Sequence, residues 1–260
     1  MADVQLVDDQ DDLHASSTTS PTSGGAESDT LRGGLDDDDI EGGDGDDDLD
    51  GDDGDDSIDG GAGDDSVIGG SGQDTISGGN GANTLRGGDG DDRVTGGDDH
   101  DDINGNVGND TESGGRGDDW VVGGKDDDDL SGDSGEDIVY GNLGDDDLDG
   151  GDDDDLVRGG QGNDTIVGGA GADWLSGDKG SDTLTGDTGA DTFHFSTGAG
   201  VDQVTDFSLS QGDRIQLDAG MTYTVSQVGA DTVIDLSNGD QVTLLGVQSS
   251  SLTGDWIFTS

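Results

Sequence analysis

A glycine recurs every nine residues from Gly24 to Gly186 without an insertion or deletion. This spacing defines 19 consecutive units over residues 24–194. Position one is glycine in all 19 units, position six is aspartate in 18, and position eight is Ile, Leu, Val or Phe in 18. The exceptions are Asn83 at position six and Glu112 at position eight. A period this strict predicts a solenoid, in which stacked units bury one apolar side chain each.

The composition favours a fold that depends on cations over a merely disordered chain. The chain has 65 acidic and 8 basic residues and a formal net charge of −57, and 61 of the acids are aspartate. High charge with few apolar residues is typical of disorder, but a solvated segment has no reason to avoid glutamate. Glycine permits positive φ, and the short aspartate carboxylate reaches local backbone or a metal. The charge argues against binding to nucleic acid or anionic lipid, and no apolar run is long enough to span a membrane.

The nonapeptide has the form G-G-x-G-x-D-x-U-x, as in GGAGDDSVI at residues 60–68, and this pattern resembles the RTX family of calcium-binding repeat proteins. The resemblance implies an all-β fold, a right-handed parallel β-roll bound to calcium, with a C-terminal β cap. Positions one to six would form a turn, and positions seven to nine a short strand whose eighth side chain points inward. Two units would make one coil, so the eighth residues alternate between two sheets.

The sixth-position side chains are the candidate metal ligands. Stacked at one strand spacing, like charges only about 5 Å apart repel each other without a cation between them. Calcium suits this gap because it accepts six to eight oxygen ligands in flexible geometry, whereas magnesium prefers a small octahedron. The candidate side-chain ligands are Asp29, Asp38, Asp47, Asp56, Asp65, Asp74, Asn83, Asp92, Asp101, Asp110, Asp119, Asp128, Asp137, Asp146, Asp155, Asp164, Asp173, Asp182 and Asp191. The family resemblance adds turn carbonyl oxygens, including those at Gly43, Gly45, Gly61, Gly63, Gly70, Gly72, Gly79, Gly81, Gly160, Gly162, Gly169 and Gly171.

The gaps between successive turns set a ceiling of about 17 calcium ions, which would leave a net charge near −23. Folding and calcium binding should then be one event, because the metal-free chain is expanded by self-repulsion. Asn83 keeps an oxygen ligand but loses a charge, so its two gaps should bind more weakly. Glu112 places a carboxylate in the core, where we expect a bulge or local mobility. Most aspartates at positions three, five, seven and nine are expected to be surface charge, and acids at position four either add ligands or strain the turn.

The two ends differ from the repeats. Residues 1–23 predict a disordered lead-in. Beyond residue 195, alternating apolar residues predict strands over 203–207, 214–217, 222–228, 232–236 and 241–247, with Asn238-Gly239 as a hairpin turn. Residues 191–217 resemble the segment that follows RTX repeats in serralysin-type proteases. The resemblance implies that residues 195–260 cap the open end of the roll, with Phe193, Phe195 and Phe207 in the capping core.

The termini also predict a route of export. The N-terminal sequence lacks the basic and apolar regions of a cleaved signal peptide. Residues 255–260 resemble the C-terminal signal of type I secreted RTX proteins, although an ordinary final strand is the alternative interpretation. The resemblance implies a bacterial protein that leaves the cell through type I secretion machinery, unfolded at low calcium, and folds in extracellular calcium.

Nothing in the sequence predicts catalysis. The chain has no H-E-x-x-H zinc motif, no G-x-S-x-G elbow and no phosphate-binding loop, which are the motifs of the common hydrolases and nucleotide-binding enzymes. We therefore expect a calcium-binding, secreted structural or binding module, not an enzyme. Two alternatives remain open: a secretion and folding module for an effector, and an adhesion module that binds extracellular polysaccharide through bridging calcium.

Overall fold

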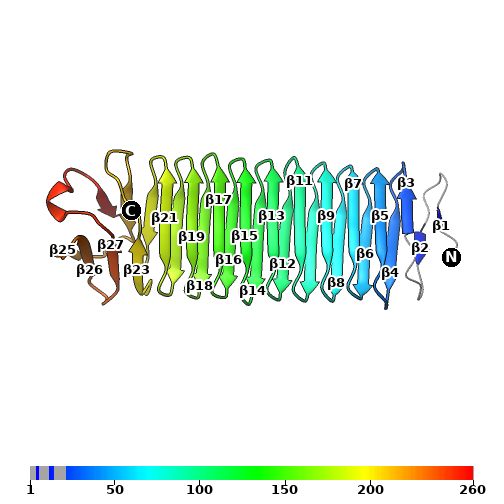
Figure 1. Cartoon of the computed structure of the whole chain (residues 1–260), viewed down its shortest axis with the longest axis horizontal. Coiled ribbons are helices and arrows are strands. Elements are labelled where there is room, and N and C mark those ends of the chain that lie inside the picture. The colour runs from blue at the N-terminus through cyan, green and yellow to red at the C-terminus, as the bar shows by residue number, and fades with distance from the viewer. Residues whose placement is uncertain (1–3, 6–11, 15–21, 260) are drawn as a thin grey trace. The chain divides into compact units, whose positions relative to one another are not determined.

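The structure is a computed structural model that describes residues 4–5, 12–14 and 22–259. The predicted lead-in over residues 1–23 therefore lies almost entirely outside the described residues. The chain divides into two compact units, Met1–Ser134 and Gly135–Ser260, here called the N-terminal and C-terminal units. Both are built from β-strands that are mostly parallel (Figure 1). Among the described residues, no helix has the length and apolar character needed to cross a membrane.

In the N-terminal unit, odd and even strands form separate parallel sheets, as the alternating strand directions in Figure 1 show. The odd sheet contains β1 (Val4–Gln5), β3 (Thr22–Gly25), β5 (Asp39–Asp44), β7 (Ser57–Ala62), β9 (Thr75–Asn80), β11 (Arg93–Asp98), β13 (Thr111–Arg116) and β15 (Asp129–Ser134). The even sheet contains β2 (Asp12–His14), β4 (Thr30–Gly34), β6 (Asp48–Asp53), β8 (Ser66–Ser71), β10 (Thr84–Asp89), β12 (Asp102–Val107) and β14 (Trp120–Lys125). Paired residues are 18 apart, as Leu85 and Ile103 are, so two repeats make one coil.

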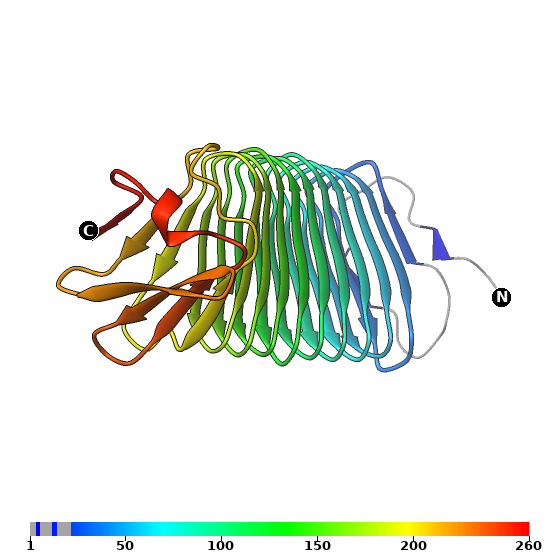
Figure 2. The same ribbon diagram turned by 60° about the vertical axis from the view of Figure 1, so that its left-hand side comes forward.

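The C-terminal unit repeats this arrangement and then departs from it. Its even sheet has the order β16 (Ile138–Leu143), β18 (Leu156–Gln161), β20 (Trp174–Lys179), β22 (Thr192–Phe195), β24 (Arg214–Leu217) and β28 (Ile257–Thr259). Its odd sheet has the order β17 (Asp147–Asp152), β19 (Thr165–Ala170), β21 (Thr183–Thr188), β23 (Val201–Val204), β27 (Gln241–Leu244), β26 (Asp231–Leu236) and β25 (Tyr223–Val228). A short 3-10 helix, η1 (Ser249–Ser251), completes the unit. In Figure 2 the coils pass from one sheet to the other through short turns.

The strands are longer than the sequence predicts. A full strand spans positions seven to nine of one repeat and positions one to three of the next, as β8 does from Ser66 to Ser71. The turn is thus reduced to positions four to six. Glycines carry no apolar pattern that would reveal a strand, yet Gly88 pairs in register with Gly70. The prediction of a six-residue turn was wrong for this reason.

The eighth-position residues form the predicted core rows. In the N-terminal unit these rows are Leu31, Leu49, Val67, Leu85, Ile103 and Val121, and opposite them Ile40, Ile58, Ile76, Val94, Glu112 and Leu130. In the C-terminal unit they are Val139, Val157, Leu175 and Phe193, and opposite them Leu148, Ile166 and Leu184. All of them are nearly or fully buried, since the eighth side chain alone points between the sheets. These rows confirm the solenoid prediction.

Glu112 occupies its core position without distorting the strand. The side chain is 2% exposed, and β13 keeps its full length. Glu112 pairs in register with Val94 on one side and Leu130 on the other. The bulge predicted for this repeat is therefore not formed, because the backbone ladders of both neighbouring strands hold the register.

Beyond the repeats, an antiparallel group covers the edge of the odd sheet of the C-terminal unit. β27 pairs in parallel with β23, while β26 pairs antiparallel with both β27 and β25. The predicted Asn238-Gly239 turn joins β26 to β27. Phe193 and Phe207 pack with ring centroids 6.2 Å apart, and Trp256 meets Phe207 edge-on at 6.2 Å. Phe195 is buried as well, so the aromatic core is as predicted with Trp256 added.

Candidate calcium-binding turns

The sixth-position side chains form hydrogen-bonded ladders through the turns. Within each unit, the N–H of a sixth-position residue donates to the Oδ1 of the sixth residue one coil further along, at 2.8 Å from Asp29 to Asp47 and 3.1 Å from Asp173 to Asp191. Asn83 continues the pattern, since its Oδ1 accepts from Asp65 at 3.0 Å. The side chains of all the predicted sixth-position ligands are 6% exposed or less. They are not a solvated acidic face but a buried part of the turn.

The second carboxylate oxygen of these residues marks the candidate site. Within the described part of the chain, this buried oxygen accepts no hydrogen bond in many of the sixth-position aspartates. The residues with such an Oδ2 include Asp47, Asp56, Asp65, Asp74, Asp92, Asp101, Asp110, Asp155, Asp164, Asp173, Asp182 and Asp191. A buried, unpartnered carboxylate oxygen is costly. A repeated row of them fits a set of cation ligands.

The first glycine of each repeat is required by this carboxylate. A Cβ placed on Gly60 would lie 2.6 Å from Asp65 Oδ2 and 2.7 Å from the Gly78 carbonyl oxygen. The same clash recurs at Gly159, where the distance to Asp164 Oδ2 would be 2.0 Å. The sixth side chain lies so close to the first residue that a Cβ does not fit there, which explains the glycine at position one.

Replacing Gly60 with alanine should destabilise the calcium-loaded protein by about 2–4 kcal/mol, because the new methyl group displaces the Asp65 carboxylate. Urea unfolding at saturating calcium measures the loss. Ser66→Ala, at an exposed position of the next strand, serves as the control and should change stability little. Equal stability of the Gly60 and Ser66 variants would contradict the assigned role of the first glycine.

The predicted carbonyl ligands lie in the gaps between coils. The second and fourth residues stack so closely that a Cβ on Gly61 would lie 2.2 Å from the Gly43 carbonyl oxygen, and one on Gly63 2.0 Å from that of Gly45. The same approach is made by Gly79, Gly81, Gly160, Gly162, Gly169 and Gly171 to residues one coil earlier, and by Gly70 and Gly72 to Asp52 and Gly54. Carbonyl oxygens thus point along the stack at nine of the predicted positions, namely Gly43, Gly45, Gly61, Gly63, Gly70, Gly72, Gly79, Gly162 and Gly171.

Where glycine is absent from position two, aspartate or asparagine replaces it, and at position four the replacement is aspartate or, at Glu27, glutamate. Asp52, Asn106, Asp133, Asn142, Asp178 and Asp187 at position two, and Asp99, Asp126 and Asp153 at position four, have φ between 61° and 81°. Asp and Asn are the non-glycine residues that best tolerate this left-handed region. Asp99, Asp126 and Asp153 at position four therefore take a positive φ, as glycine does at this position in other repeats.

The fifth-position residues have a structural role that sequence reasoning missed. A fifth-position Oδ1 accepts the N–H of the fifth residue one coil later, as Asp37 does from Asp55 at 3.1 Å and Asp145 from Asn163 at 2.7 Å. Asn109 takes part in the same way. These side chains are exposed, and in the sequence they look like ordinary surface charge. Only the recurrence of Asp and Asn at this position signals the second ladder.

Burial raises the pKa of many of the sixth-position carboxyls, mainly through loss of hydration. It raises the pKa of Asp92 to about 7, although the hydrogen bond from the Asp74 backbone lowers it, and the charges of Asp74 and Asp110 raise it further. Asp101 rises less, to a pKa of about 6, because both the backbone and the amide of Asn83 hydrogen bond to it. Without a cation, the row is thus poorly suited to carry full negative charge.

The side chains alone do not complete a metal site. Among the described residues, no three His, Cys, Asp or Glu side chains converge to hold a metal ion. Main-chain carbonyl oxygens of the second and fourth positions, which face the next coil, are the other candidate oxygen ligands. A mixed set of carboxylate and carbonyl oxygens between flexible turns suits calcium better than magnesium or a transition metal.

A model of the RTX calcium-binding nonapeptide repeat, four copies long, matches most of the chain. The matched segments are residues 23–58, 41–76, 50–85, 77–112, 113–139, 131–166, 140–175, 158–193 and 167–204. Together they run from residue 23 to residue 204, well over half of the sequence. The chain belongs to the RTX repeat family. Membership and the ladder geometry together support calcium binding by the RTX roll.

Three solved structures are similar to this chain, and the first of them supports the β-solenoid fold. A hyperactive, Ca²⁺-dependent, β-helical antifreeze protein from an Antarctic bacterium matches with a TM-score of 0.52 and 24% identity, over 80% of this chain and 69% of that one. The AlgE6R3 subunit of the Azotobacter vinelandii mannuronan C5-epimerase matches with a TM-score of 0.36 and 29% identity, over 48% and 80%. The extracellular lipase LipA from Serratia marcescens matches with a TM-score of 0.30 and 19% identity, over 69% and 40%. Among curated proteins, no sequence matches the RTX chain.

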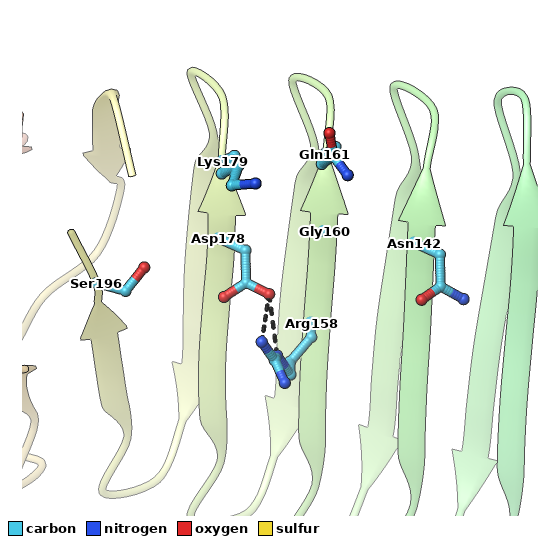
Figure 3. A pocket seen from close by; sticks show the side chains of 7 residues that line it. All are labelled: Asn142, Arg158, Gly160, Gln161, Asp178, Lys179 and Ser196. Atoms are coloured by element: carbon cyan, nitrogen blue, oxygen red, sulfur yellow. Dashed lines mark hydrogen bonds and ion pairs between the residues drawn. The ribbon is translucent and has the colours of Figure 1, made fainter. Parts of the chain in front are cut away.

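A groove lies on the even sheet of the C-terminal unit, where β18 and β20 lead into the RTX turns (Figure 3). Its lining residues are Asn142, Arg158, Gly160, Gln161, Asp178, Lys179 and Ser196. Arg158 donates from Nε and Nη2 to Asp178 Oδ2, at 3.0 and 2.6 Å. Asp178 is the one carboxylate in this lining.

Proposed function

We propose that this chain is a calcium-binding module that folds when calcium enters the gaps between its RTX turns outside the cell. The observation that carries the proposal is the row of buried sixth-position Oδ2 atoms without a partner among the described residues. A divalent cation shared by successive turns would give each Oδ2 atom a partner and would remove the repulsion between the stacked carboxylates. The sixth-position residues and the second- and fourth-position carbonyls would hold the ions.

Calcium supply then controls whether the roll is folded. Extracellular calcium modules bind with dissociation constants of about 10⁻⁴–10⁻³ M. Inside a cell, where calcium is scarce, a chain of charge −57 would remain expanded by self-repulsion. This supports export in unfolded form, for which type I secretion machinery is the proposed route, and a structural or binding role after folding.

Residues 195–260 are proposed to cap the roll. β27 covers the edge of β23, and β28 covers the edge of β24. Both edges would otherwise present unpaired backbone groups. The aromatic cluster of Phe193, Phe207 and Trp256 closes the interior beneath them.

Far-ultraviolet circular dichroism of chelator-treated protein, followed during a calcium titration, tests the proposal. We expect a cooperative gain of β-sheet signal as calcium approaches about 1 mM, and none with the same concentration of magnesium. A chelated protein that is already fully folded, or one that folds equally well with magnesium, would overturn the proposal.

A further inference from the structure

One sixth-position ladder continues past the last nonapeptide. Asp202 follows Asp182 by 20 residues, two more than the repeat allows, so the nine-residue count does not reach it. β21 and β23 nevertheless pair Thr183 with Gln203, the register that sets Asp202 beside Asp182. The Asp182 N–H donates to Asp202 Oδ1 at 3.1 Å, as in the ladder itself.

Asp202 also has a buried Oδ2 without a hydrogen-bond partner among the described residues, as many of the sixth-position aspartates do. Asp182 and Asp202 are each 1% exposed. Among the described residues, neither Oδ2 accepts a hydrogen bond. The next strand, β27, has Val242 at this register, so Asp202 is the last carboxylate of this row.

The other edge of the roll ends differently. Asp213 follows Asp191 there, and its Oδ1 accepts the Asp191 N–H at 3.3 Å. However, Asp213 Oδ2 accepts the Ser208 N–H at 2.7 Å. Both oxygens of Asp213 thus accept backbone hydrogen bonds, and this edge ends without the unpartnered, buried Oδ2 that Asp202 has.

We propose that Asp182 and Asp202 bind a calcium ion at the junction of the last repeats and the cap. The inference rests on the proposed function, because it assumes that calcium fills the equivalent gaps of the roll. It adds one ion to the ceiling of about 17 set by the nonapeptides. Because β23 pairs directly with β27, this ion would also make the order of the cap dependent on calcium.

Asp202→Asn tests the site with little change of shape. The chain already contains the equivalent natural case, since Asn83 accepts the ladder hydrogen bond and donates from Nδ2 to the Gly81 carbonyl. Native mass spectrometry of the full chain, titrated with calcium alone, counts the bound ions. Because the asparagine Nδ2 would take the place of Asp202 Oδ2, as Asn83 Nδ2 does in its own turn, we expect Asp202→Asn to bind one ion fewer than the wild type at the calcium concentration that fills the repeat sites. Asp235→Asn, which removes the same charge from an exposed residue of β26, should bind the full number.

The outcomes separate this inference from the proposed function. A wild-type protein that binds no calcium overturns both. A wild-type protein that loads many ions, with an equal count in Asp202→Asn, overturns the junction site alone. Anomalous scattering from calcium-soaked wild-type crystals does not depend on any variant folding. It should show an ion about 2.3–2.6 Å from oxygens of Asp182 and Asp202, and the absence of a peak there beside occupied repeat sites would also overturn the inference.

Discussion

Replacing Glu112 with leucine should stabilise the calcium-loaded protein by about 2–4 kcal/mol at neutral pH. Both carboxylate oxygens of Glu112 are buried without a hydrogen-bond partner among the described residues. Its neighbours in the core row are Val94 and Leu130, and leucine already serves at this position in Leu148 and Leu184. The substitution therefore removes an unmet polar group and restores a continuous apolar row.

This stabilisation should grow with pH. Burial raises the pKa of Glu112 well above its usual value, and the charges of Asp110, Asp128 and Asp92 add to the shift. Above about pH 4.5 the unfolded chain has released this proton while the folded protein retains it. Stability therefore falls as pH rises towards the folded pKa, and the leucine variant escapes this loss.

Urea unfolding at saturating calcium, at pH 5 and pH 8, measures both effects. Glu41→Leu, at an exposed position of β5, provides the matched control and should shift neither midpoint strongly. A Glu112→Leu protein that is less stable than the wild type, or whose advantage shrinks at pH 8, would show that the buried carboxylate has a stabilising partner.

Chelated protein should gain β structure when the pH is lowered from 8 to 5. Burial raises the pKa of Asp155 and Asp191 to about 7, whereas an unfolded aspartate titrates near 3.9. Between these values the folded, metal-free form binds more protons than the unfolded chain, so its stability increases as pH falls. Protons would then partly replace calcium in neutralising the ladders.

Circular dichroism in the presence of chelator, with light scattering to exclude aggregation, measures this gain. Calcium should restore the β-sheet signal at pH 8, where protons no longer do so. A chelated protein with the same unfolded spectrum at pH 8 and pH 5 would contradict the assignment of raised pKa values to the sixth-position row.

The repeat period predicted the solenoid, the core rows and the stacked rows of sixth-position carboxylates because each depends on one recurring residue type, but it did not predict the hydrogen bonds that join those carboxylates into ladders. It did not predict the strand length, since paired glycines such as Gly70 and Gly88 have no side-chain pattern. It predicted a bulge at Glu112 because a single buried acid carries no information about the backbone ladders that hold it. Asp202 escaped detection for a simpler reason: two inserted residues shift it out of the period.

The two hydrogen-bond ladders run in opposite directions, and this gives a cut roll two chemically different ends. Sixth-position N–H groups donate to the following coil, while fifth-position N–H groups donate to the preceding one. Removing coils from the C-terminal side therefore leaves the last position-six N–H groups without acceptors. Removing coils from the N-terminal side does the same to the first position-five N–H groups. Asp202 and Asp213 accept the N–H groups of the last two sixth-position residues. A shortened or transplanted roll would therefore need a carboxylate after the last sixth-position residue on each edge, so that both N–H groups have acceptors.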